Sequence, residues 1–281
     1  MSPQFVQANG LRFAYLEQGT GPLVVMVHGF PDTAHTWDKA IEAVANAGYR
    51  AVAPFQRGYY PTEIPPNGPF DSEAQGRDIL ALIDALGAKT AIVVGHDWGA
   101  TAAYAAAAMG PERVSLLVTL AIPHPRSLKP TPRALWGARH FFALRRNGAA
   151  AKIRKNDFKY VDELWHRWSP AWESIPAEET RHVKEAFAHP GCLEAACAYY
   201  KTISPVLSKV QQMPITVPAV AFAGEDDDLI KPRHFEKARH FFTSSYEVVQ
   251  MRGGHFMHRE HPAEFTAELV RVLRDHERRA A

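Results

Sequence analysis

The chain has 281 residues, of which 46% are hydrophobic, 22% charged and 11% aromatic. These proportions are typical of a folded globular protein and exclude disorder, collagen and a coiled coil. The 32 lysines and arginines nearly balance the 30 aspartates and glutamates, which leaves a net charge of +2. The basic residues are scattered, apart from a short cluster within residues 145–155, so we expect no nucleic acid partner.

The first residues, 1–7, carry neither the basic region nor the apolar region of a secretion signal. No segment approaches the roughly 20 apolar residues of a membrane span. We therefore expect a cytoplasmic protein without a membrane partner, as a monomer or homodimer. The two cysteines, Cys192 and Cys197, match neither a disulfide framework nor a Cys-x-x-Cys metal motif, and we interpret both as apolar packing residues.

The first predicted element is a β-hairpin. Residues 5–8 and 11–16 flank Asn9-Gly10, the dipeptide that best tolerates the positive φ of a type I′ turn. Short, continuously apolar runs follow, and these are typical of parallel strands buried on both faces. The predicted strands are residues 23–27, 51–53, 91–94 and 116–120, and the predicted helices are residues 37–47, 72–86 and 100–109. This alternation predicts a mostly parallel, doubly wound α/β sheet.

The alternation stops near Pro123 and returns at residues 214–218, before two further predicted strands at 219–223 and 246–251. The segment between holds four of the six tryptophans and no convincing strand. We predict a helical cap inserted into the sheet domain, although its helices could also belong to the main layer. The predicted division is a core of residues 1–123, a cap of residues 124–213 and a second part of the core, residues 214–281.

The most informative motif is Gly95-His96-Asp97-Trp98-Gly99, which joins a buried strand to a helix. This context is that of a nucleophile elbow, a tight turn that needs glycines on either side, with Asp in the nucleophile position. At the start of a helix, the helix dipole and free amides favour the ionised carboxylate, so Asp97 is the predicted nucleophile. The alternative is that Asp97 is only a helix N-cap.

A second motif, His28-Gly29-Phe30-Pro31, follows the first buried strand. The backbone amides of Phe30 and Trp98 are the predicted oxyanion hole, because the glycine lets this loop approach the elbow. We interpret His28 as a hydrogen-bonded structural residue that holds the loop.

A histidine base and its carboxylate partner are predicted in the last two loops. His255 follows the final strand and can act as general base, and Asp227 is preferred over Asp226 and Asp228 as the acid that orients it. The spacing of His255, His258 and His261 raises a metal site as an alternative, but no Cys or well-spaced carboxylate completes a ligand set. We expect no metal and no organic cofactor.

With these motifs in this order, the chain resembles the α/β-hydrolase superfamily over essentially its whole length, and within it the epoxide hydrolase and haloalkane dehalogenase branch. The likeness is carried by His28-Gly29-Phe30-Pro31, Gln56-Arg57-Gly58-Tyr59, Gly95-His96-Asp97-Trp98-Gly99, Gly224-x-x-Asp227 and Gly253-Gly254-His255-Phe256. The resemblance supports Asp227 as the acid. It implies that Asp97 attacks a substrate carbon to form an ester, which water activated by His255 then hydrolyses.

The segment Ala198-Tyr199-Tyr200-Lys201 resembles the part of epoxide hydrolases that supplies a cap tyrosine, and Tyr200 matches that tyrosine. The other aromatic segment reads His140-Phe141-Phe142 and lacks a hydroxyl, so the second donor is not identified; Tyr160 is the candidate. We assign Tyr160 and Phe141 to substrate binding.

The resemblance therefore predicts an epoxide hydrolase that converts a small, largely apolar organic epoxide to a diol. One alternative is a haloalkane dehalogenase, in which Trp98 and a cap tryptophan (Trp136, Trp165, Trp168 or Trp172) hold the halide. The other is a binding protein with this fold and no turnover. Three of the four tryptophans in the insertion, Trp165, Trp168 and Trp172, could line the pocket or fix the cap to the core, and we expect the second.

Overall fold

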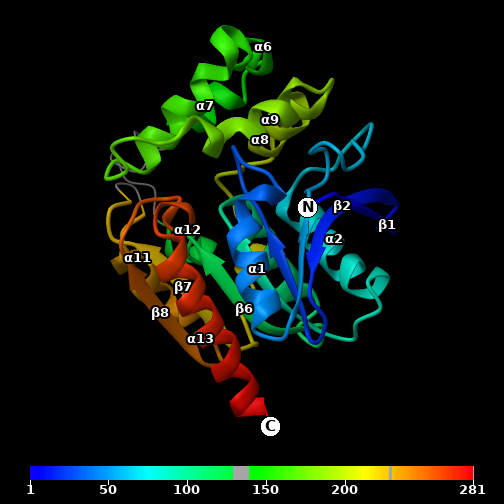
Figure 1. The fold of residues 1–281 in the computed structure, drawn as a ribbon, viewed down its shortest axis with the longest axis vertical. Helices are drawn as coiled ribbons and strands as arrows, with labels where there is room; N and C mark the ends of the chain where they lie inside the picture. Colours follow the sequence, from blue (N-terminus) through cyan, green and yellow to red (C-terminus); the bar gives the residue numbers. More distant parts are fainter. Residues whose placement is uncertain (129–138, 228–229, 281) are drawn as a thin grey trace.

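A computed structural model describes residues 1–128, 139–227 and 230–280. It contains an eight-stranded sheet in the order β1-β2-β4-β3-β5-β6-β7-β8 (Figure 1). The strands are β1 (Gln4–Ala8), β2 (Leu11–Gln18), β3 (Leu23–Val27), β4 (Arg50–Pro54), β5 (Ala91–His96), β6 (Val114–Leu120), β7 (Ala219–Gly224) and β8 (Tyr246–Met251). Only the pairings of β2 with β1 and with β4 are antiparallel, so the predicted mostly parallel sheet is confirmed.

The predicted hairpin is also confirmed. Strands β1 and β2 pair with Ala8 opposite Leu11, and the turn residues Asn9 and Gly10 have φ of 45° and 77°. Positive φ at both positions is what a type I′ turn requires.

Helices cover both faces of the sheet. They are α1 (Asp38–Asn46), α2 (Ser72–Ala85), α3 (Trp98–Met109), α11 (Pro232–Ala238), α12 (Met257–Glu260) and α13 (Pro262–Ala280). Helices α1 and α13 lie side by side and pack with Val24 and Met26 of β3, whereas α2, α3 and α11 pack with Val25 and Val27 on the other face (Figure 1). Successive strand residues point to opposite faces, which explains why the central strands are apolar at every position.

Between β6 and β7 the described chain forms short helices and, within those residues, no strand. They are η2 (Pro125–Ser127), α5 (Arg139–Leu144), α6 (Ala149–Ile153), α7 (Lys155–Trp168), α8 (Ala177–Ala188), α9 (Cys192–Lys201) and α10 (Lys209–Gln212). We call these the insertion helices, and Figure 1 shows α6 to α9 together beyond one end of the sheet.

Hydrogen bonds identify that end as the carboxyl edge of the parallel strands. The indole of Trp165 donates to the Pro31 carbonyl after β3, and the hydroxyl of Tyr199 donates to the Arg57 carbonyl after β4. Trp165 also stacks on Phe256, with ring centroids 4.0 Å apart. The expectation that the insertion tryptophans fix these helices to the core is thus confirmed for Trp165.

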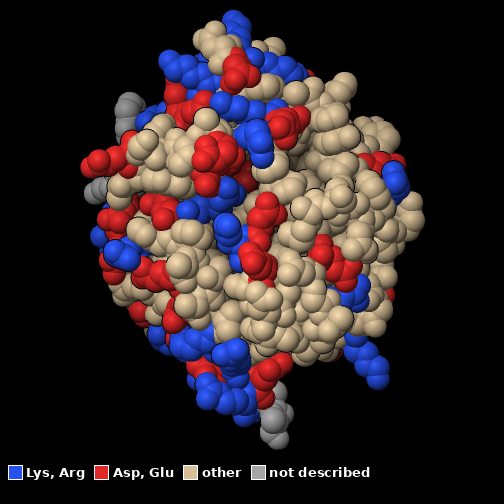
Figure 2. All heavy atoms as spheres, viewed as in Figure 1, with Lys and Arg blue, Asp and Glu red and all other residues tan. Residues whose placement is uncertain are grey.

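Both cysteines are free and buried, in agreement with their interpretation as packing residues. In the part of the chain that the structure describes, no helix is long and apolar enough to cross a membrane. Figure 2 shows lysine, arginine, aspartate and glutamate side chains interspersed over the insertion helices, whereas the face over β1, β2 and α2 carries few charges. The charge visible on this side is therefore mixed in sign.

Candidate active site

Asp97 occupies a strained turn between β5 and α3, with φ of 52° and ψ of −116°. Positive φ is costly for a residue other than glycine and persists only where the surroundings impose it. The flanking glycines explain how: a Cβ on Gly99 would lie 2.1 Å from the Val27 carbonyl oxygen, and one on Gly95 would lie 2.2 Å from the Gly99 carbonyl oxygen. Helix α3 begins at Trp98, two residues before the predicted start at residue 100. Gly99, which permits the close approach to the Val27 carbonyl, therefore lies in the first turn of the helix.

The carboxylate of Asp97 does not act as a side-chain cap for α3. Instead its Oδ1 accepts a hydrogen bond of 2.9 Å from the backbone amide of Phe30. Gly29 permits this approach, since a Cβ there would lie 2.3 Å from the Asp97 Cβ. The Asp97 side chain is therefore not an N-cap. The Phe30 amide, predicted as an oxyanion-hole donor, points at the Asp97 carboxylate.

His28 holds the same loop, as predicted. Its Nδ1 lies 2.9 Å from the Gly29 carbonyl oxygen and its Nε2 accepts from the Gln56 amide at 3.0 Å. Burial lowers the pKa of His28 to about 4, so its imidazole is neutral, with the proton on Nδ1.

His255 lies between two carboxylates. Its Nε2 is 3.3 Å from Asp97 Oδ2, and its Nδ1 is 3.4 Å from Asp227 Oδ2. Asp227 is itself positioned by the Ile230 amide, which donates to its Oδ1 at 2.8 Å. Asp226 accepts instead from the Gly253 amide, at 3.1 Å. The structure thus brings Asp227 rather than Asp226 to the histidine, and Asp228 lies outside the described residues.

The two carboxylates control the charge of His255. Burial lowers the pKa of this imidazole, but the hydrogen bonds and charges of Asp227 and Asp97 outweigh burial and raise it to about 9. For Asp97 the effects have the opposite signs. Burial raises the pKa of its carboxyl group, but the hydrogen bond and charge of His255 outweigh burial, so the pKa is lowered overall. At neutral pH the site therefore holds an imidazolium between two carboxylates.

The neighbouring histidines remain neutral and do not form a metal site with His255. His96 Nε2 donates to the His255 carbonyl at 2.9 Å, and burial lowers the pKa of His96 to about 3. His258 Nε2 lies 2.7 Å from Thr36 Oγ1, and burial holds the pKa of His258 well below its usual value. The Nε2 of each ring thus has its own partner, and His255, His258 and His261 do not form a metal-ligand group among the described residues, which disfavours the metal alternative.

Tyr200 lies in α9, and its buried phenol ring packs beside the nucleophile elbow at Asp97. Its ring lies edge-on to Phe30 and Trp98, at centroid distances of 5.1 and 5.4 Å. Burial and then the charge of Asp97 raise the pKa of Tyr200 well above its usual value, so the hydroxyl keeps its proton. Phe141 packs against Tyr200, with ring centroids 5.4 Å apart. Tyr160, which belongs to α7, has a pKa raised chiefly by burial and is a neutral phenol.

The sequence analysis did not predict two aromatic residues that contact the histidines of the site. Trp168 lies 5.1 Å from the His255 ring, and its carbonyl accepts from the His255 amide at 2.8 Å. Tyr59 is buried 4.7 Å from the His28 ring. Tyr59 belongs to the Gln56-Arg57-Gly58-Tyr59 motif, which could have indicated it. Trp168 was considered as an anchor, a pocket-lining residue or a halide ligand, but not as a neighbour of His255. Trp136 lies outside the described residues.

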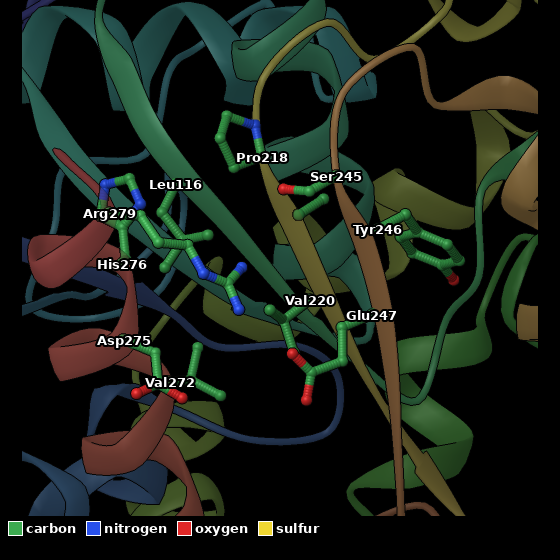
Figure 3. A pocket seen from close by; sticks show the side chains of 11 residues that line it. Leu116, Pro218, Val220, Ser245, Tyr246, Glu247, Val272, Asp275, His276 and Arg279 are labelled. Atoms are coloured by element: carbon green, nitrogen blue, oxygen red, sulfur yellow. The ribbon is translucent and has the colours of Figure 1, made fainter.

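A hollow lies at the opposite edge of the sheet from Asp97. It is bordered by the first residues of β7 and β8 and by the last turns of α13, where Figure 3 shows Glu247, Asp275, His276 and Arg279. Asp97 follows the carboxyl end of β5, and ligands of open parallel sheets bind at that edge. The hollow is therefore separate from the candidate active site.

The family model for the alpha/beta hydrolase fold matches residues 22–262, and the chain belongs to this family. It is a hydrolase and is close to epoxide hydrolases. It is 28% identical to the AB hydrolase superfamily protein YfhM of Bacillus subtilis (strain 168), over 97% of this chain and 98% of that protein. It is also 28% identical to epoxide hydrolase A of Mycobacterium tuberculosis, over 96% of each chain.

Among solved structures, epoxide hydrolase A of Mycobacterium thermoresistibile superposes with a TM-score of 0.83 at 28% identity, covering 97% of this chain and 98% of that one. These relatives support the epoxide hydrolase branch that the motifs indicated. With hydrolase membership established, the binding-protein alternative is set aside.

The geometry predicts that Asp97 keeps His255 protonated. In Asp97→Asn, we expect the pKa of His255 to fall from about 9 toward 6.5, the usual value for histidine, measured by NMR titration of isotope-labelled histidine. Because the raised pKa means tighter proton binding in the folded state, its stabilisation is complete below pH 6.5 and is lost as the pH rises through about 9.

Asp226→Asn is the control, since Asn can still accept from the Gly253 amide. In that variant, His255 should titrate as in the wild type. A wild-type His255 that titrates near 6.5 would contradict this account of the site.

Proposed function

We propose that the protein is an epoxide hydrolase that acts through an ester on Asp97. The proposal rests mainly on the ionised carboxylate of Asp97. Its Oδ1 accepts from the Phe30 amide at 2.9 Å, and its Oδ2 lies 3.3 Å from His255 Nε2. A carboxylate attacks an electrophilic sp³ carbon productively, whereas its attack on an ester would leave an anhydride. In this proposal, residues 124–213 form a cap over the catalytic edge, and the epoxide hydrolase names of the relatives give independent support.

In the first step, an Asp97 oxygen bonds to an epoxide carbon as the ring C–O bond breaks. The ring oxygen takes the proton of the Tyr200 hydroxyl, which is buried against Phe30 and Trp98 and remains a phenol at neutral pH. Tyr160 is the candidate for a second donor. The aromatic side chains around Tyr200, including Phe141, suit a small, largely apolar epoxide.

Formation of the ester removes the charge of Asp97 and so prepares His255 for the second step. That charge is one of the two that hold the proton on His255. As the pKa of His255 falls, its proton can return through solvent to the Tyr200 oxygen. The neutral imidazole, still oriented by Asp227, is then able to act as a base.

In the second step, His255 takes a proton from water as the water oxygen attacks the carbonyl carbon of the Asp97 ester. The amides of Phe30 and Trp98 stabilise the resulting oxyanion. The adduct collapses with cleavage of its bond to the alkyl oxygen, which takes the proton of the new hydroxyl and leaves as the diol. Asp97 is again a carboxylate and His255 an imidazolium, so protons balance over the cycle.

Removal of the base should trap the ester. We expect His255→Ala, incubated with a panel of epoxides and haloalkanes, to gain the mass of a whole epoxide in intact-protein mass spectrometry. The double variant Asp97→Asn/His255→Ala should gain nothing. A gain equal to an alkyl group without its halogen would instead establish the dehalogenase alternative, and a whole-epoxide adduct retained by the double variant would reject Asp97 as the nucleophile.

Tyr200 and Tyr199 make a matched pair for testing the proton donor. We expect Tyr200→Phe to lower kcat for epoxide opening by about 10²-fold, since a general acid typically contributes 10²–10⁴-fold. Tyr199→Phe removes only the hydrogen bond to the Arg57 carbonyl. It should leave kcat within about threefold and lower the free energy of unfolding by about 1 kcal/mol in urea denaturation. Equal kcat losses in both variants would contradict the assignment to Tyr200.

A further inference from the structure

Two histidines form a contact between the core and the insertion helices, away from the catalytic triad. His35 lies in η1 (Ala34–Trp37), just after the Phe30 loop, and His182 lies in α8. Their rings are stacked, with centroids 3.9 Å apart and planes inclined by 16°. Segments almost 150 positions apart in the sequence thus bring two imidazoles into direct contact.

A carboxylate accompanies each histidine. His35 Nδ1 lies 3.3 and 3.1 Å from the two carboxylate oxygens of Asp38. His182 Nδ1 lies 3.6 Å from Glu185 Oε2. In both pairs the acid follows the histidine by three positions, a spacing that places two helical side chains on one face.

The potential ligand atoms already lie close together. One nitrogen or oxygen each from His35, Asp38 and His182 falls within 4.8 Å of the other two. An imidazole in its neutral form offers the lone pair of one ring nitrogen to a metal. Two imidazoles with one or two carboxylates are a ligand set that Zn²⁺ accepts.

We propose that His35, Asp38 and His182 bind a divalent transition metal, with Zn²⁺ as the best match. Glu185 lies beside His182 but outside this group of three, and it becomes a fourth ligand only by turning toward the ion. This proposal departs from the expectation of no metal, which considered the two cysteines and the histidines from His255 onward but not these residues. The proposal does not depend on the reaction proposed above.

Metal binding requires the side chains to rearrange. Tetrahedral zinc with bonds of about 2.1 Å separates its ligand atoms by roughly 3.4 Å. The atoms must therefore approach and the two rings must turn out of their stack, so that both lone pairs point at the ion. Side-chain exposures of 19% for His35, 41% for Asp38 and 32% for His182 leave room for this rotation.

The position of the site implies a structural effect. Arg259 donates to the His35 carbonyl at 3.5 Å and pairs with Glu179, which lies one turn before His182 on α8. A bound metal would add a second link between α8 and the core beside this ion pair. Bound zinc should therefore stabilise the packing of α8 on η1.

The test is isothermal titration of the tag-free, chelator-treated full chain with Zn²⁺ alone. We expect one zinc per chain, a loss of at least tenfold in affinity in His35→Ala and His182→Ala, and a weaker loss in Glu185→Gln. Co²⁺ in place of Zn²⁺ should give the visible absorption of a tetrahedral site. At a free zinc concentration 100 times Kd, the wild-type Tm should rise by about 5 °C, and that of His182→Ala should not.

Two variants separate this site from other histidines. His240→Ala removes an exposed histidine in η3 (Arg239–Phe241), and His255→Ala removes the triad histidine, and both should bind zinc as the wild type does. Asp38→Asn removes the negative charge of Asp38 but keeps an oxygen that can accept from His35. It therefore tests the carboxylate ligand while both imidazole rings stay in place. Undiminished zinc binding by His182→Ala and Asp38→Asn, or no binding by the wild type, would overturn the proposal.

Discussion

The charge balance around Asp97 is the constraint on which the rest of the site depends. A largely buried carboxylate such as that of Asp97, whose side chain is 13% exposed, is costly unless opposite charge and hydrogen bonds compensate for the lost hydration. The His255 imidazolium and the Phe30 amide provide this compensation, and Asp227 keeps the histidine oriented. The same charge keeps the histidine protonated, so in the proposed reaction the base becomes available only after Asp97 has been alkylated.

The backbone geometry at the elbow follows from this arrangement. The carboxylate reaches the Phe30 amide because Gly29, Gly95 and Gly99 let β3, β5 and α3 approach more closely than any side chain would allow. These contacts explain why Asp97 can persist at a φ of 52°. Rigid elements thus hold both the predicted nucleophile and one predicted oxyanion donor.

Local sequence patterns predicted most of the sheet and the chain order of the site, because these features are encoded in short segments. Apolar runs predicted the buried strands, and Asn9-Gly10 predicted the hairpin turn. The start of α3 was misplaced because Gly99, unfavourable in a helix, is required there by the Val27 carbonyl. The contacts of Trp168 with His255 and of His35 with His182 were not predicted, since periodicity gives the buried face of a helix but not its partner.

The central claim is that water attacks the Asp97 carbonyl carbon and not the substrate. It is tested most directly by a single turnover of an epoxide with excess wild-type enzyme in H₂¹⁸O, followed by mass spectrometry of the diol and of the peptide that contains Asp97. The account predicts that the label enters the Asp97 carboxylate while the first diol released is unlabelled. Label in the diol from the first turnover, with none in the peptide, would contradict it.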